Sequence, residues 1–85
     1  MIPSRKAIMA GMDKLQKDQS LRFTIPDTFG GGVALIQLNP EAGKRYILKV
    51  AQDLETARLA PPYWSHNKSE PIAKWVADRL GDIMS

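Results

Sequence analysis

Three short segments of this sequence have the apolar and polar pattern of β-strands, and breaks rich in glycine, proline and asparagine separate them. The segments are 21–25, 33–38 and 45–51. The first and third alternate with a period of two, which is typical of strands that bury one face, and the second is largely aliphatic. Because short breaks join strands that run in opposite directions, the pattern predicts a three-stranded antiparallel meander.

A segment with helical spacing precedes the strands. Ser4 is a candidate N-cap, and Ile8, Met12 and Leu15 follow at spacings of four and three residues. Such spacing places the three apolar side chains on one stripe of a helix. We therefore predict an amphipathic helix that runs to about Asp18.

A second helix is predicted at the C-terminal end, with Ser69 as the candidate N-cap and Pro71 in the first turn, where proline costs no hydrogen bond. Its apolar stripe comprises Ile72, Trp75, Val76, Leu80 and Ile83. Before it, Asp53 is able to cap a helical turn over 54–59, but this segment is too short for its pattern to decide whether a helix forms. Residues 63–68 show little periodicity, and we expect a loop there.

Together these elements predict an α+β fold with two layers and the order α-β-β-β-α, in which both helices pack on one face of the meander. The chain has 85 residues. A chain of this length buries about 60–65% of its unfolded surface, which is enough for a single core. We expect a single small domain over residues 1–85.

The face of the predicted sheet that points away from the helices is unusually rich in aliphatic and basic residues. Its expected members are Arg22, Thr24, Val33, Leu35, Gln37, Arg45, Ile47 and Lys49. Val33, Leu35 and Ile47 are more apolar than a face in water requires, so we expect another surface to cover them. The predicted partner-binding residues are Arg22, Val33, Leu35, Arg45, Ile47 and Lys49.

This face leads to two hypotheses about function. The first is a small non-enzymatic binding module that self-associates as a homodimer, or binds another protein, through its aliphatic residues. The alternative is a nucleic-acid-binding protein. It would use Arg22, Arg45 and Lys49 on the sheet, with Arg5, Lys6 and Lys44 at its margins. The formal net charge of +3 fits both.

Residues that carry chemistry are scarce. The chain has no cysteine and one histidine, His66, beside Ser65, whereas a structural zinc site needs four ligands. Asp78 and Asp82 lie one helical turn apart without a third ligand nearby. We expect no catalytic residues, no metal site and no cofactor.

The sequence leaves two loop segments open to more than one interpretation. Gly30–Gly32 either adopts positive φ in a turn or binds an anion through its amide groups. Tyr63 and Trp64 follow Pro61-Pro62, and they form either a second contact for a partner or a plug that closes the core.

The N-terminal sequence predicts a cytoplasmic location. Met1-Ile2-Pro3-Ser4-Arg5-Lys6 has no apolar run behind it, and no stretch approaches the ~20 apolar residues of a membrane span. We expect no signal peptide and no membrane partner.

Overall fold

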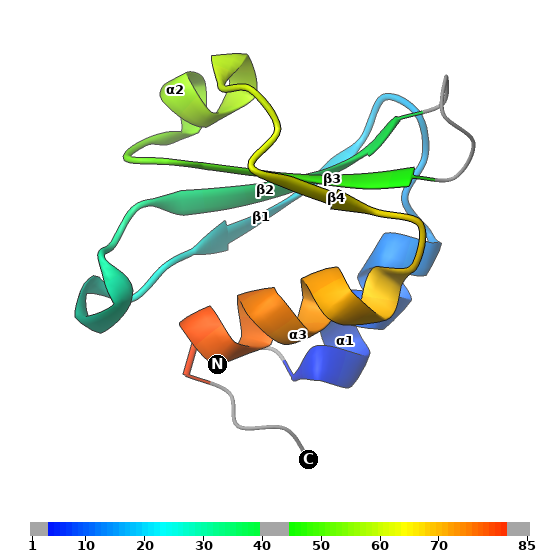
Figure 1. Cartoon of the computed structure of the whole chain (residues 1–85), viewed down its shortest axis with the longest axis horizontal. Coiled ribbons are helices and arrows are strands. Elements are labelled where there is room, and N and C mark those ends of the chain that lie inside the picture. The colour runs from blue at the N-terminus through cyan, green and yellow to red at the C-terminus, as the bar shows by residue number, and fades with distance from the viewer. Residues whose placement is uncertain (1–3, 40–44, 82–85) are drawn as a thin grey trace.

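A four-stranded antiparallel sheet forms the centre of the computed structural model, which describes residues 4–39 and 45–81. The strands are β1 (Ser20–Thr24), β2 (Val33–Asn39), β3 (Arg45–Ala51) and β4 (Trp64–His66), and they lie side by side in this order. Helices α1 (Arg5–Asp13) and α3 (Ser69–Arg79) cover one face, and α2 (Leu54–Leu59) lies over the other (Figure 1). The predicted α+β class and the meander with two helices on one face are confirmed.

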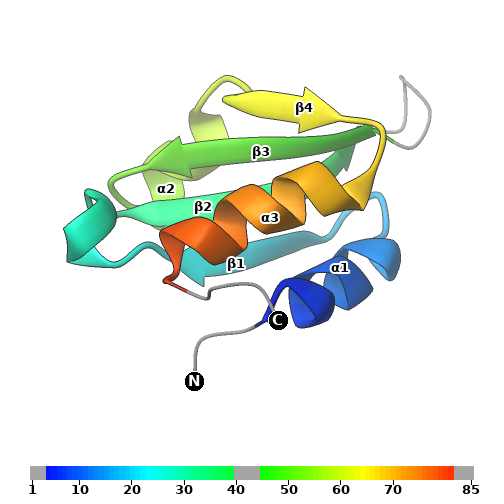
Figure 2. The same cartoon turned by 60° about the horizontal axis from the view of Figure 1, so that its bottom comes forward.

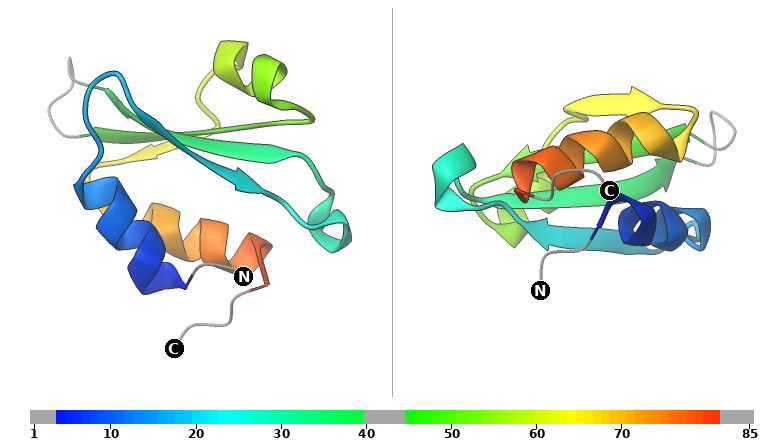
Figure 3. Two further views of the ribbon diagram at one scale, coloured as in Figure 1. Left: turned by 180° about the vertical axis from the view of Figure 1, so that it is seen from behind. Right: turned by 90° about the horizontal axis from the view of Figure 1, so that it is seen from below.

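The core lies between the sheet and the pair α1 and α3. Strand pairing brings Leu21, Ile36, Leu48 and Trp64 into one row across the sheet. The fully buried side chains that α1 and α3 add are Ile8, Met12, Ile72 and Val76. Figure 2 shows α3 in front of the central strands and α1 on the β1 side, and Figure 3 shows the two helices from behind and from below. The predicted apolar stripes therefore meet one sheet face.

The ends of α1 and α3 follow from local hydrogen bonds. Ser4 caps α1, because its hydroxyl oxygen accepts a hydrogen bond from the Ala7 amide at 3.2 Å. The helix ends at Asp13, earlier than predicted, yet Leu15 remains buried. At α3 the N-cap is Lys68 and not Ser69, so that prediction is wrong by one residue.

The C-terminal end of α3 is Arg79, and Gly81 follows with a φ of 79°. A left-handed glycine just after a helix is a common way to end it. The predicted continuation through Ile83 lies outside the described residues. No helix in residues 4–39 and 45–81 is long and apolar enough to cross a membrane.

Two elements between residues 52 and 68 change the predicted order. Helix α2 forms, because the Asp53 carboxylate accepts a hydrogen bond from the Thr56 amide at 2.8 Å. The loop predicted over 63–68 is wrong, since Trp64–His66 forms β4 and pairs with Tyr46–Leu48 of β3. Three residues are too few to show alternation, and the open edge of β3 supplies the partners that make this strand form.

Helix α2 changes the character of the second sheet face. Leu35, which faces away from α1 and α3, is only 1% exposed. Ala57 is the buried residue of α2, and this helix contacts β2 and β3. Figure 1 shows α2 above the sheet, on the side opposite the other helices. A short helix of the same chain therefore covers the aliphatic residue for which we expected an external partner.

Leu35→Glu is expected to abolish the cooperative thermal unfolding transition. An unpaired carboxylate buried beneath α2 costs several kcal/mol, which is comparable with the total stability of about 5–15 kcal/mol for a small domain. The matched control is Gln37→Glu, because Gln37 lies two residues along the same strand and face but is only partly buried. Circular dichroism should show a transition within a few degrees of the parent for the control. A folded Leu35→Glu protein would contradict the burial of Leu35.

The capping carboxylate of α2 predicts a dependence on pH. The hydrogen bond from the Thr56 amide holds the pKa of Asp53 below its usual range. A lowered pKa contributes stability that is present above the ordinary pKa of aspartate and is lost as the pH falls through the lowered value. A carboxyl titration followed by NMR should give an Asp53 midpoint in the folded protein below that of the same aspartate in an unstructured peptide of the local sequence. Asp53→Asn should keep the helix but remove this acid dependence, and an ordinary Asp53 midpoint would contradict the cap.

Candidate functional site

The outer face, which we define as the strand residues pointing away from α1 and α3, holds the six residues of the first predicted partner contact. Its first row is Arg22, Leu35 and Lys49, and the next row is Gln37, Ile47 and Ser65. Val33 and Arg45 lie on the same face in further rows. The pairing of the strands therefore brings residues that are far apart in the sequence onto one surface.

The aliphatic part of the outer face differs from our expectation. Leu35 is covered by the chain itself, so the prediction that it is an exposed contact residue is wrong. Val33 and Ile47 are partly buried. The continuous apolar patch that a homodimer through this face would need is therefore reduced to the margins of α2.

The three cations of the outer face differ in exposure, because Arg45 and Lys49 are partly buried. Arg22 is exposed. The Lys49 ammonium donates to the carbonyl oxygen of Arg58 near the end of α2 at 3.1 Å, and the Arg45 guanidinium donates to the Ser65 hydroxyl at 3.2 Å. These contacts fix the positions of two cations without neutralising their charge.

No strand contains a carboxylate, so the outer face has a uniform sign. The sequences of the four strands are SLRFT, VALIQLN, RYILKVA and WSH. Helix α2, which lies over this side, carries Asp53 at its N-cap and Glu55 in its first turn. Arg58, in the last turn of α2, adds a further cation. The sheet surface itself is positive wherever it is charged.

Tyr63 and Trp64, the predicted second contact, point in different directions. Trp64 faces the helices and packs partly buried against the core, which supports the plug interpretation for this residue. Tyr63 is 60% exposed, and its ring lies 5.5 Å from that of Trp75 at an interplanar angle of 51°. The Arg79 guanidinium lies 5.0 Å from the Trp75 ring centroid. Only Tyr63 of the predicted pair is largely exposed.

The structure separates Ser65 from His66. They are neighbours on a strand, so their side chains point to opposite sheet faces and do not form a nucleophile and base pair. The His66 Nδ1 accepts a hydrogen bond from the Lys68 amide at 3.0 Å. This contact gives the histidine a structural role between β4 and α3.

Of the two carboxylates considered as metal ligands, Asp78 and Asp82, only Asp78 lies in the described part of the chain. Asp78 pairs with Lys74 at 3.1 Å, and Asp82 lies outside the described residues. Within residues 4–39 and 45–81, no group of three histidine, cysteine, aspartate or glutamate residues is placed to hold a metal ion.

The glycine loop is a turn whose amide groups are largely used. Gly30, Gly31 and Gly32 all have positive φ, between 70° and 101°. The Gly30 amide donates to the Asp27 carbonyl at 3.0 Å, and the Gly31 amide donates to the Pro26 carbonyl at 3.1 Å. Since two of its amides already have backbone acceptors, the loop favours the turn interpretation over anion binding.

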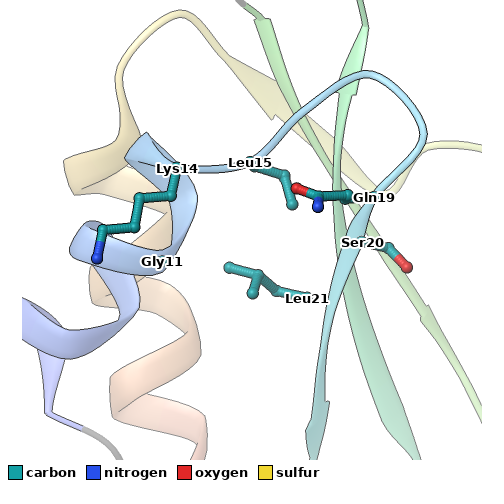
Figure 4. A pocket seen from close by; sticks show the side chains of 6 residues that line it. All are labelled: Gly11, Lys14, Leu15, Gln19, Ser20 and Leu21. Carbon is teal, nitrogen blue, oxygen red and sulfur yellow. The ribbon is translucent and has the colours of Figure 1, made fainter.

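A hollow of about 470 Å³ opens between α1 and the edge of the sheet. Its lining residues, shown in Figure 4, are Gly11, Lys14, Leu15, Gln19, Ser20 and Leu21. Nothing in the periodicity of the sequence predicts this groove. The one local hint in the sequence is Gly11, a glycine inside an amphipathic helix. A Cβ added at this position would lie 3.2 Å from a Leu21 methyl carbon, so the glycine allows close packing between α1 and β1.

Comparison of the chain with models of known protein families, with curated proteins and with solved structures gives no significant match. Arguments about function therefore rest on the surfaces described above.

Proposed function

We propose that this protein is a small non-enzymatic binding module that contacts the phosphate backbone of a nucleic acid through its outer face. The observation that carries the proposal is the presence of Arg22, Arg45 and Lys49 on a sheet whose strands contain no carboxylate. Cations on one surface neutralise successive phosphates and release the condensed counterions, which favours binding.

The burial of Leu35 favours the nucleic-acid hypothesis over the homodimer hypothesis. A homodimer through the outer face depends on aliphatic burial, and Leu35 of that face is already buried within the chain, beneath α2. Binding to phosphates depends on exposed charge, and α2 leaves Arg22 exposed while it positions Lys49.

The basic residues expected at the margins of the sheet contribute less to the proposed phosphate contact than the cations on the strands. Arg5 and Lys6 lie on α1, on the opposite side of the sheet, and Arg5 is 3.7 Å from Glu70. Lys44 lies outside the described residues. The proposed contact therefore uses the sheet cations, with Gln37 and Ser65 as polar neighbours. The outer strand positions carry no aromatic residue, so we expect little stacking on bases.

Reversal of two outer-face charges tests this proposal. Arg22→Glu combined with Lys49→Glu should weaken binding to a fluorescent 20-nucleotide duplex by at least about tenfold at low salt, because two phosphate contacts become repulsive. Anisotropy titrations at several salt concentrations should also give a slope of log affinity against log salt that is shallower by about two units, since each contact contributes about 0.9.

The matched control is Lys17→Glu combined with Lys68→Glu, which changes the net charge equally at exposed residues outside the strands. It should keep most of the affinity of the parent. Equal losses in both double variants would mean that net charge, and not the outer face, attracts the nucleic acid. No binding by the parent at low salt would overturn the proposal.

Self-association is the second candidate function, and the exposure of Leu59 favours it. Leu59 is the last residue of α2 and is 89% exposed, while Ile47 on the outer face is only partly buried. A leucine that is this exposed is a natural contact point for a second copy.

If the chain self-associates through α2, Leu59→Lys should shift it to a monomer of 9.5 kDa at concentrations where the parent sediments as a dimer. Analytical ultracentrifugation at several concentrations measures this. A parent that stays monomeric throughout would eliminate the second candidate and leave the phosphate-binding proposal untouched.

A further inference from the structure

The open edge of β1 and the groove beside it form a surface distinct from the outer face. Strand β1 is the first in the sheet order, and no described strand pairs with its other edge. The Ile25 amide donates to the Gly32 carbonyl at 2.9 Å, so residues 21, 23 and 25 share hydrogen bonds with β2. The alternate residues Ser20, Arg22 and Thr24 therefore direct their amide and carbonyl groups toward the open edge.

This edge lacks most of the features that protect natural sheet edges. Strand β1 contains no proline and one charged residue, Arg22, in the sequence SLRFT. Protected edges usually carry prolines, bulges, several charges or a covering segment. An unprotected edge is a ready template for an added strand.

The groove lies where the inward side chains of an added strand would go. Leu21 projects from β1 toward Gly11 of α1, where the absence of a Cβ lets the Leu21 methyl groups approach closely, and both residues line the groove (Figure 4). Leu15 adds apolar surface, and Lys14 is the only charged residue of the lining. An incoming strand can thus place an apolar side chain on Leu21 and a carboxylate near Lys14.

We infer that the β1 edge binds an extended acidic peptide segment, which adds to the sheet as a fifth strand and places its inward side chains in the groove. Charge decides against a second copy of the chain as the occupant. Two β1 strands paired about their centres would bring Arg22 opposite Arg22, and like charges in that position are destabilising. A segment with the pattern valine, any residue, glutamate matches both Leu21 and Lys14.

The probe for this inference is the peptide acetyl-Thr-Val-Thr-Glu-Thr-Val-Thr-amide, titrated into the ¹⁵N-labelled protein. We expect the largest amide shifts at Gly11 and Ser20–Thr24, with new protection from hydrogen exchange at the amides of Ser20, Arg22 and Thr24. Shifts confined to the outer strand positions of β2 and β3 would place the acidic peptide on the outer face and overturn the inference.

Charge variants provide the matched control. Lys14→Glu should lower the affinity for the peptide by about fivefold to tenfold. Lys17→Glu, at an exposed position outside the groove lining, should leave the affinity within about twofold of the parent. Replacing the peptide glutamate with lysine should have the same effect as Lys14→Glu. Equal effects of the two protein variants would contradict a specific contact with Lys14.

A change in the peptide alone tests strand addition without any risk to folding. Two peptides carry N-methyl groups on alternate residues, one in each phase. In a strand paired with β1, only every second peptide residue donates its amide to β1. Methylation of those amides should therefore abolish binding, and methylation of the other set should preserve it. Loss in neither peptide would exclude strand addition, and loss in both would exclude the alternating geometry. A β1 edge that pairs with a second copy would instead show protection that grows with protein concentration without the peptide.

Discussion

The sheet has apolar residues on both of its faces, and the fold depends on covering both. Helices α1 and α3 cover one face and form the main core, and the six-residue helix α2 covers Leu35 on the other. Two local contacts hold α2 in place: the Asp53 cap at its start and the hydrogen bond from Lys49 to the Arg58 carbonyl near its end. Burial of one leucine therefore explains why a short helix, which would not be stable alone, forms here.

The position of α2 over Leu35 determines which surfaces remain available to partners. With Leu35 buried, the outer face is defined by its cations and not by its aliphatic residues, which favours a phosphate backbone over a second copy. The β1 edge offers a different chemistry, since it combines free backbone groups with a groove that contains Leu21 and Lys14. The two surfaces can be tested independently, because the first depends on the cations of the outer face and the second on strand pairing at β1 and on Lys14.

The sequence predicted the features that depend on local periodicity. Alternation in residues 21–25 and 45–51 assigned the strand residues to their faces, and the spacing of Ile8 and Met12 located the first helix. It missed β4, because a three-residue strand has no period and exists only through pairing with β3. It also did not show that 54–59 folds back over Leu35, since nothing in a sequence states which face a short connecting helix covers.

A nuclear Overhauser experiment on the methyl groups tests the central claim, that α2 of the same chain covers Leu35 on the outer face. Leu35 and Ala57 are both buried between β2 and α2, so their methyl groups should give a direct cross-peak in dilute, monomeric protein. The peak should persist in the presence of a nucleic acid, because the proposed contact leaves α2 in place. An absent peak, with the Leu35 methyl groups accessible to a soluble relaxation agent, would contradict the account.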